Sequence, residues 1–178
     1  MKKTLAIVGA LACLTLAGFA PGQAAFVFNP GTGHYYDVTD TNIGWEEAEA
    51  EAILKGGHLV AIQDAAEESW LVGTFGSERF WIGFTDKASE GTWLWSSGDP
   101  VTYVNWASGE PNNATPPEWG EDYAVMNWSG PAWNDWDKER YDYYPIHGII
   151  EVSAVPLPAS ILLFGSALLG LLPWRRKP

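Results

Sequence analysis

The charged residues of this 178-residue chain are segregated along its length, and this limits how much of the chain can form a folded domain. All 22 acidic residues lie between Asp37 and Glu151 with only five of the ten basic residues, so this middle stretch has a formal net charge of −17. The two ends are apolar and carry the other five basic residues. Residues 26–154 have the length of one ordinary globular domain. Their acidity excludes nucleic acid as an expected partner and favours binding of hard cations.

The first 25 residues have the pattern of a secretory signal peptide. Lys2 and Lys3 precede an apolar run over residues 5–20, and small residues stand before a predicted cleavage near Ala24 or Ala25. The pattern predicts that the domain is exported. Since the only cysteine, Cys13, lies in this leader, the mature domain can form no internal disulfide bond.

Residues 155–178 have the pattern of a short membrane anchor. A Pro-containing segment precedes an apolar stretch, and Arg175, Arg176 and Lys177 follow it. The 14 residues 159–172 would cover, as a helix, about two thirds of a ~30 Å hydrocarbon core, so they could span a bilayer only with their flanks. The stretch is apolar on all sides, which argues against an amphipathic helix of the domain. The basic ends place both termini on the cytoplasmic side and the acidic domain outside.

This tail, which begins Val-Pro-Leu-Pro-Ala at Val155, resembles the PEP-CTERM sorting signal of Gram-negative bacteria in its VPLPA variant. The resemblance covers about the last two dozen residues. It implies recognition by an exosortase-type membrane protease and transient anchoring in the inner membrane. The final destination would be the cell surface or an extracellular matrix.

The first half of residues 26–154 carries the helical signals. Residues rich in β-formers predict an opening pair of short strands at 26–28 and 34–38. Apolar residues at helical spacing predict a helix over about 43–55. Asp64 followed by Glu67 is the capping-box pattern of a second helix that reaches about residue 74.

The second half alternates short strands with polar loops. Strands are predicted at residues 80–84, 93–95, 123–127 and 148–152. The stretch 104–122 shows no regular pattern, and so long a loop is uncommon in a compact domain unless it is functional. The loop is therefore the expected place of a site.

Short motifs rich in tryptophan, acidic and amide residues run through residues 26–154. They are WEEA from Trp45, GHLVAI from Gly57, EE from Glu67, WIGFTD from Trp81, WLW from Trp93, NW from Asn105, EPN from Glu110, WND from Trp133 and IIE from Ile149. In this order they resemble a C-type lectin-like domain over nearly the whole stretch. The resemblance implies an α+β fold, in which two helices pack on small antiparallel sheets and a long loop region binds calcium.

The resemblance assigns a principal calcium site to five side chains. Calcium takes six to eight oxygen ligands, which requires carboxylates and amide carbonyls from separate loops. Alone, Glu-Pro-Asn or Asn-Asp is typical of a polar turn, but together with a further glutamate they match the family's site. The five residues are Glu110, Asn112, Glu121, Asn134 and Asp135. In the family the peptide bond before the residue matching Pro111 is cis and turns both flanking carbonyls toward one ion.

The same residues imply a sugar specificity. In the family, vicinal sugar hydroxyls complete the calcium shell and exchange hydrogen bonds with the Glu and Asn side chains. The order Glu110-Pro111-Asn112 goes with mannose, glucose, N-acetylglucosamine or fucose, whereas galactose binders usually carry Gln-Pro-Asp. Trp119 and Trp136 stand close to this set in the sequence, and each is either a ring on which a sugar stacks or part of the loop packing.

A second, auxiliary calcium site has two interpretations. Asp86 and Glu90 stand four residues apart, as in mannose-binding members of the family, and Asp122 follows Glu121 as expected there. Asn113 stands where those members often have Asp, so one negative charge is missing and weaker binding is expected. The other interpretation is a solvated acidic turn.

The chain also departs from the family in its cysteines. The four framework cysteines would fall at Ala52, Tyr123, Lys138 and Ile150, so both bridges are absent together. Losing a native bridge typically costs a small secreted domain about 2 to 5 kcal/mol. We expect packing of Ala52 against Ile150, and of the Lys138 stem on the Tyr123 ring, to replace them.

These patterns predict an exported, calcium-dependent carbohydrate-binding domain held at the cell surface or in an exopolysaccharide matrix. The alternative is a structural or adhesive surface protein, in which calcium only rigidifies the loops and the ligand is another protein. An enzyme is not expected, because the sequence motifs of zinc peptidases, serine hydrolases and phosphate-binding loops are absent and the thiol lies in the leader.

Overall fold

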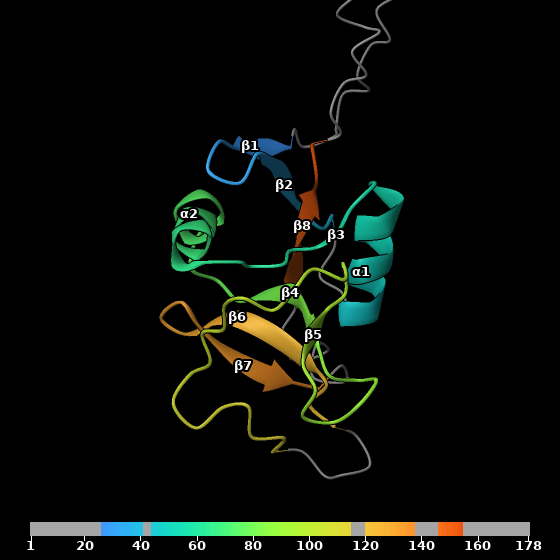
Figure 1. Ribbon diagram of the computed structural model, residues 1–178, viewed down its shortest axis with the longest axis vertical. Coiled ribbons are helices and arrows are strands. Elements are labelled where there is room, and N and C mark those ends of the chain that lie inside the picture. Colours follow the sequence, from blue (N-terminus) through green and yellow to red (C-terminus); the bar gives the residue numbers. More distant parts are fainter. Residues whose placement is uncertain (1–25, 41–43, 115–119, 138–145, 155–178) are drawn as a thin grey trace, which may run out of the picture.

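The computed structural model describes residues 26–40, 44–114, 120–137 and 146–154. Two helices and eight strands follow one another in these residues (Figure 1). In chain order they are β1 (Val27–Asn29), β2 (His34–Val38), α1 (Trp45–Leu54), β3 (His58–Leu59), α2 (Ala65–Phe75), β4 (Phe80–Thr85), β5 (Leu94–Trp95), β6 (Tyr123–Ser129), β7 (Ala132–Trp136) and β8 (His147–Val152). The two helices and the opening strand pair are confirmed close to their predicted bounds. None of the described helices is long and apolar enough to cross a membrane, and both predicted terminal signals lie outside the described residues.

The strands form one sheet in the order β1-β2-β8-β4-β6-β7, with β3 attached to β8 and β5 to β4. This confirms the predicted α+β architecture with one correction, because β4 and β8 pair in parallel whereas only antiparallel pairs were expected. Short turns force neighbouring strands to be antiparallel, but β4 and β8 are far apart in the sequence and are free of that constraint. Figure 1 shows α1 and α2 on opposite sides of β2 and β8.

Helix α1 packs against the sheet through residues at helical spacing. Trp45, Ala48 and Ala52 are buried, while the acidic residues of the first turn face solvent. The chain then passes so close beneath β8 that a Cβ at Gly57 would collide with the backbone carbonyl of Glu151. Ala52 on α1 and Ile150 on β8 are both fully buried. Apolar burial therefore occupies both positions of one absent bridge, whereas Lys138 of the other lies outside the described residues.

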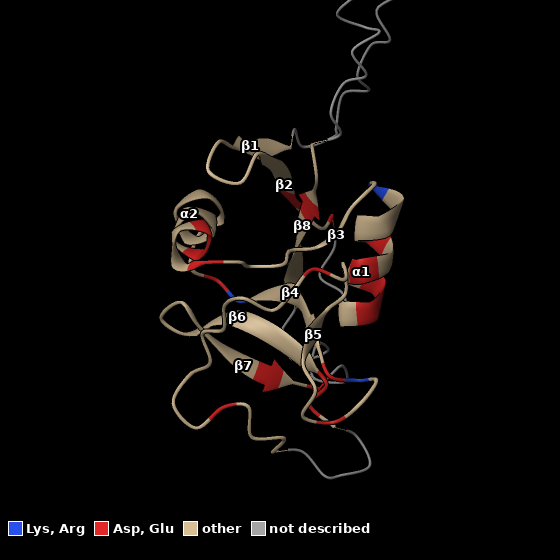
Figure 2. Cartoon of the chain, viewed as in Figure 1, with Lys and Arg blue, Asp and Glu red and all other residues tan. Residues whose placement is uncertain are grey.

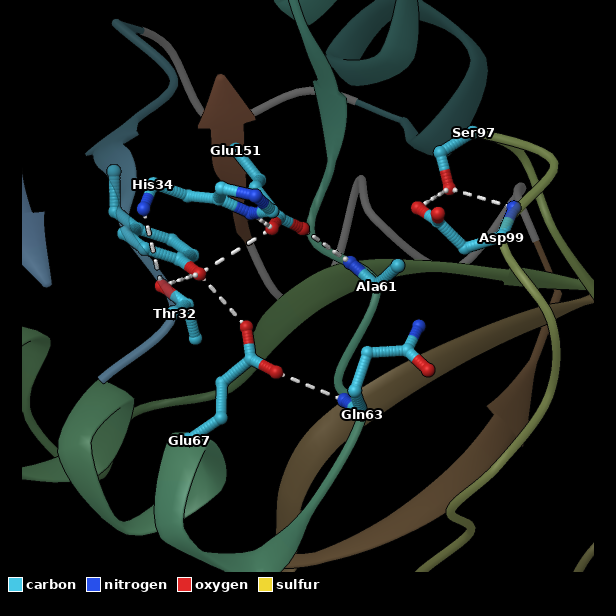
Figure 3. Close-up of polar contacts among 9 residues, drawn as sticks. Thr32, His34, Ala61, Gln63, Glu67, Ser97, Asp99 and Glu151 are labelled. Atoms are coloured by element: carbon cyan, nitrogen blue, oxygen red, sulfur yellow. Dashed lines mark hydrogen bonds and ion pairs between the residues drawn. The ribbon is translucent and has the colours of Figure 1, made fainter. Parts of the chain in front are cut away.

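Helix α2 begins with the predicted cap, since the Asp64 carboxylate accepts a hydrogen bond from the Glu67 amide at 2.8 Å. The Glu67 carboxylate, however, accepts from the Gln63 amide and the Tyr36 hydroxyl, both at 2.8 Å, instead of reaching back to the cap residue (Figure 3). Burial raises the pKa of Glu67, and the negative charges of Glu151 and Asp64 add to the shift. The hydrogen bond from Tyr36 to Glu67 ties α2 to β2.

The aromatic core lies on both faces of β4. Alternate residues of a strand point to opposite sides, and accordingly Phe80, Ile82 and Phe84 belong to one buried cluster while Trp81 belongs to another. In the second cluster Trp45 stacks on Tyr123 with ring centroids 4.8 Å apart, and its indole nitrogen donates to the Ile82 carbonyl at 2.7 Å. Trp81, Trp95 and Trp133 are buried in these clusters, whereas Trp93 and Trp106 are half-buried.

The carboxylate of Glu68, which is 4% exposed, fixes the start of the long loop onto α2. One of its oxygens accepts from the Tyr103 hydroxyl and the Asn105 amide, each at 2.8 Å, and the other accepts from the Trp133 indole at 2.6 Å. Burial, followed by the hydrogen bond to Glu68, raises the pKa of Tyr103 to about 12. Helix α2, the loop and β7 are therefore joined by a single side chain.

Replacing Glu68 by Gln should lower the unfolding free energy by about 1–3 kcal/mol, because the amide group presents a donor where the carboxylate accepts and leaves a buried partner unpaired. Urea denaturation monitored by tryptophan fluorescence measures the change. The matched control is Glu47→Gln on the exposed side of α1, which should change stability little. Equal effects of the two substitutions would refute the role given to Glu68.

Candidate functional site

The loop between β5 and β6 is laid along the start of β7 by backbone hydrogen bonds. The Trp133 amide donates to the Asn105 carbonyl at 2.7 Å, and the Ala107 amide donates to the Trp133 carbonyl at 2.8 Å. Trp106 and Trp133 form an isolated parallel bridge. This pairing carries the following residues of the loop to Asn134 and Asp135 on β7.

The peptide bond between Glu110 and Pro111 is cis, as the resemblance implies. Directly after it, the amides of Asn112 and Asn113 both donate to one oxygen of Asp135, at 2.9 and 2.7 Å. Asp135 is 1% exposed, so its carboxylate organises this turn from beneath. The Glu-Pro-Asn turn and the Asn-Asp pair, separate in the sequence, are therefore in direct contact.

Glu121 joins the same turn from the far end of the loop. Its carboxylate accepts from the Ala114 amide at 2.7 Å, and its own amide donates to the Asn113 side-chain carbonyl at 3.0 Å. Glu121 is 5% exposed. Contacts of the turn thus join four of the five residues assigned to the principal site, Glu110, Asn112, Glu121 and Asp135, and the fifth, Asn134, directly precedes Asp135 on β7.

Three buried oxygens of this set have no hydrogen-bond partner. They are Oε2 of Glu110, Oδ1 of Asn134 and Oδ1 of Asp135. The Asn134 amide nitrogen donates to the Asp135 carbonyl at 2.6 Å, which leaves its oxygen as the free atom. Buried polar atoms are nearly always paired, and each exception needs an explanation such as an ion. Because all three atoms are acceptors, a hard cation with oxygen ligands fits them.

The electrostatics of the site point the same way. Burial raises the pKa of Glu110, and a hydrogen bond that its protonated form shares with Asp135 and the negative charges of Asp135 and Glu121 raise it further, while a hydrogen bond from Asn112 acts in the opposite direction. In the described part of the chain, no three His, Cys, Asp or Glu side chains are arranged to hold a metal ion by themselves. Glu110, Glu121 and Asp135 therefore do not by themselves form such a cluster, and the oxygens of Asn112 and Asn134 would have to complete the set.

The auxiliary set is partly assembled. Asp86 is 2% exposed, and one of its oxygens accepts from the Gly91 amide at 2.8 Å while the other is buried without a partner. Burial, followed by the charges of Glu90 and Asp122, raises the pKa of Asp86 to about 6. Glu90 is exposed. Asn113 turns its side-chain oxygen toward the Glu121 amide, so this oxygen already serves the principal turn.

Of the two tryptophans considered as stacking platforms, Trp119 lies outside the described residues. Trp136 is 3% exposed and packs edge-to-face against Trp81 and Trp128, with the Arg79 guanidinium 5.1 Å from its ring centroid. The packing interpretation therefore holds for Trp136, because both ring neighbours and Arg79 cover it. Closeness to Asp135 in the sequence did not indicate this burial, because successive side chains of β7 point to opposite faces and Trp136 therefore points away from Asp135.

Glu68 is the site-supporting residue that sequence reasoning missed. The pair Glu67-Glu68 is part of the resemblance, and Glu67 has a predicted role as the capping-box partner of Asp64, but Glu68 has none. The available signal was its place in the first turn of α2 at a buried position, where an acidic residue needs partners.

Two helices on a mixed sheet, with an acceptor-rich loop docked on its last hairpin, define a C-type lectin-like domain. The family model described as "Lectin C-type domain" matches residues 41–144, and the chain belongs to this family. It is a family of binding domains, and no enzyme family is indicated.

Individual relatives agree. "C-type lectin domain family 17, member A" of Homo sapiens is 36% identical over 65% of this chain, which spans only 29% of that protein. "Galactose-specific lectin nattectin" of Thalassophryne nattereri is 33% identical over 64% of this chain and 67% of that protein. The solved carbohydrate-recognition domain of the mouse scavenger receptor C-type lectin is 32% identical, with a TM-score of 0.59, over 70% of this chain and 92% of that chain.

The crowded carboxylates predict how the metal-free domain responds to pH. Because the pKa of Glu110 is raised on folding, the folded state binds more protons than the unfolded state above about pH 4, and stability in chelator should fall as pH rises toward 7. Asp135→Asn removes the strongest neighbouring charge but keeps an oxygen for the turn, so the fall should be smaller. Urea midpoints at the two pH values measure it.

The control for this experiment is Asp99→Asn, which removes an equal charge from an exposed turn. It should leave the pH dependence close to that of the wild type. An unchanged dependence in Asp135→Asn would show that Glu110 does not sense Asp135.

Proposed function

We propose that this domain binds carbohydrate in a calcium-dependent manner, with mannose, glucose, N-acetylglucosamine or fucose as the sugar class. The carrying observation is the group of three buried, unpaired acceptor oxygens beside the Glu110-Pro111-Asn112 turn. A lone polar turn would satisfy these atoms by itself or expose them to water. Membership in the lectin family supports the same function.

In this proposal each residue has a distinct part. Oxygens of Glu110, Asn134 and Asp135 would hold the ion, and Asn112 and Glu121 would complete the set. Calcium supplies open coordination positions for two vicinal hydroxyls. Glu110 accepts hydrogen bonds from a sugar and the Asn112 amide donates them, so the pair on either side of Pro111 reads the orientation of the diol.

We also propose that the domain is exported by its leader, anchored transiently in the inner membrane through residues 155–178, and delivered by an exosortase-type pathway to the cell surface or extracellular matrix of a Gram-negative bacterium. The support is the sequence pattern of both ends. Display of many copies in a polysaccharide matrix would raise a weak affinity for single sugars through multivalency.

The second candidate is a structural or adhesive protein in which calcium only stiffens the loop. One observation favours it: oxygens of Asp135 and Glu121 already accept backbone hydrogen bonds within the loop, so the turn has internal restraints independent of a sugar. The ligand would then be another protein.

Calcium should raise the melting temperature of the domain, since binding to the folded state at a hundredfold excess over Kd adds about 2.7 kcal/mol, on the order of 10 °C. Calorimetry with millimolar calcium and then with chelator measures the shift. Asp99→Asn should keep the shift and Asp135→Asn should lose most of it. The shift should also fade below about pH 5, because the ligands must be ionised. No shift in the wild type would refute calcium binding.

The double substitution Glu110→Gln with Asn112→Asp tests the sugar. It keeps the number of oxygen ligands and the charge of the pair but exchanges the acceptor side with the donor side. Calcium stabilisation should survive, while preference should move from mannose toward galactose. Calorimetric titration of both proteins with both sugars measures the change. If both proteins bind calcium but neither binds any sugar, the second candidate is supported.

A further inference from the structure

One end of this acidic domain is free of formal charge. We define the uncharged pole as residues 26–36 and 152–154, which contain no Asp, Glu, Lys or Arg. Figure 2 shows the contrast between β1 with its hairpin turn and the acidic residues elsewhere. On a stretch of net charge −17, such a pole is the surface that can approach another anionic surface with least repulsion.

The carboxylates next to the pole in sequence are also withdrawn from solvent. The Glu151 side chain is 12% exposed, with one oxygen bonded to His34 and the other accepting from the Ala61 amide at 3.0 Å (Figure 3). Asp37 is 6% exposed. The residues next to the pole in sequence therefore present little negative charge, and the exposed Asp64 beside the β1–β2 turn is the nearby carboxylate that remains open to solvent.

An aromatic row crosses this pole. Phe28 and Tyr35 are directly opposite each other on β1 and β2, with ring centroids 5.0 Å apart, and they are 47% and 42% exposed. Tyr35 is in turn opposite Val152, the last residue of β8. Directly paired residues share one face of a sheet, so the three side chains form a row. Exposed aromatic rings grouped in this way usually mark a contact surface.

The row ends where the apolar tail is attached. Only residues 153–158 separate β8 from the apolar stretch 159–172, and six residues reach at most about 20 Å. If that stretch lies in a bilayer, the pole must lie within this distance of the hydrocarbon. Phe and Tyr favour the interface between headgroups and acyl chains, where an aromatic ring and a hydroxyl can both be accommodated.

We propose that the Phe28–Tyr35–Val152 row rests in the headgroup region of the bilayer that holds the tail. The proposal rests on the membrane role of residues 155–178 given above. The strands β1 and β7 are at opposite ends of the sheet order. Docking through β1 and β2 therefore turns the calcium and sugar site, which β7 carries, away from the membrane.

A single fluorescent label tests the docking. The mature chain, which lacks the apolar leader and Cys13, has no thiol, so Val27→Cys places one label on β1, beside Phe28 but on the opposite face of the strand, at a position that is 41% exposed. The chain is reconstituted in phosphatidylcholine–phosphatidylglycerol vesicles that contain a lipid with a nitroxide in the headgroup region. We expect strong quenching at position 27 and none at a label placed by Leu54→Cys on α1, which is 88% exposed.

A matched pair of double substitutions distinguishes anchoring by the tail from docking by the aromatic row. Phe28→Ser with Tyr35→Ser removes the row and should abolish most of the quenching at position 27. Leu54→Ser with Leu94→Ser removes two exposed apolar residues elsewhere and should leave the quenching unchanged. Vesicle flotation should be the same for all variants, because the tail is intact.

Each failure has its own signature. Equal quenching at positions 27 and 54, or quenching that survives loss of the row, would overturn the docking while leaving the anchor intact. Absence of flotation would overturn the membrane role of the tail, and the docking with it. Burial of the label without lipid, increasing with protein concentration, would assign the row to a second copy of the chain and overturn the proposal.

Discussion

The buried carboxylate of Glu68 is the contact on which the position of the loop depends. The loop has no regular structure up to its bridge with β7, and no disulfide can tie the mature domain together. Glu68 accepts hydrogen bonds from Tyr103 and Asn105, which precede the bridge, and from Trp133, the bridge residue on β7, so one residue of α2 sets the register between the loop and β7. That register places Glu110 beside Asp135. The site is thus held by neutral donors around one charge, a stable arrangement in a buried environment.

The candidate calcium site differs from the surroundings of Glu68, because it holds several hydrogen-bond acceptors and too few donors. Backbone amides satisfy one oxygen each of Asp135 and Glu121, and the buried atoms without a hydrogen-bond partner, on Glu110, Asn134 and Asp135, are all acceptors. Negative charge kept at such a place raises the pKa of Glu110 and disfavours the ionised form. A cation would relieve this repulsion and would coordinate the buried oxygens that lack a hydrogen-bond partner. The same geometry that lowers stability without metal would therefore be suited to binding one.

The two ends of the sheet have opposite character. The acceptor-rich loop lies against β7, whereas β1 and β2 carry uncharged, exposed aromatic residues beside the last residue of β8. Because charge is segregated within the domain, its two ends suit different surroundings, and this can orient the ligand site. A chain fixed at the aromatic end would present its ligand site toward the outside, so orientation follows from the placement of charge and of the tail on the same sheet.

The sequence by itself determined the features that depend on neighbours in the chain: the two helices, the Asp64 cap and the first hairpin. The five residues assigned to the calcium site through the family resemblance stay a prediction. Tertiary structure decided the parallel pairing of β4 with β8, the burial of Trp136 and the roles of Glu67 and Glu68. These depend on distant partners, which are 31 residues away for Glu67 and Tyr36, 65 for Glu68 and Trp133, and 67 for Phe80 and His147. Local propensity holds no information about such partners, because the energy that selects them arises only when distant segments pack and exclude water.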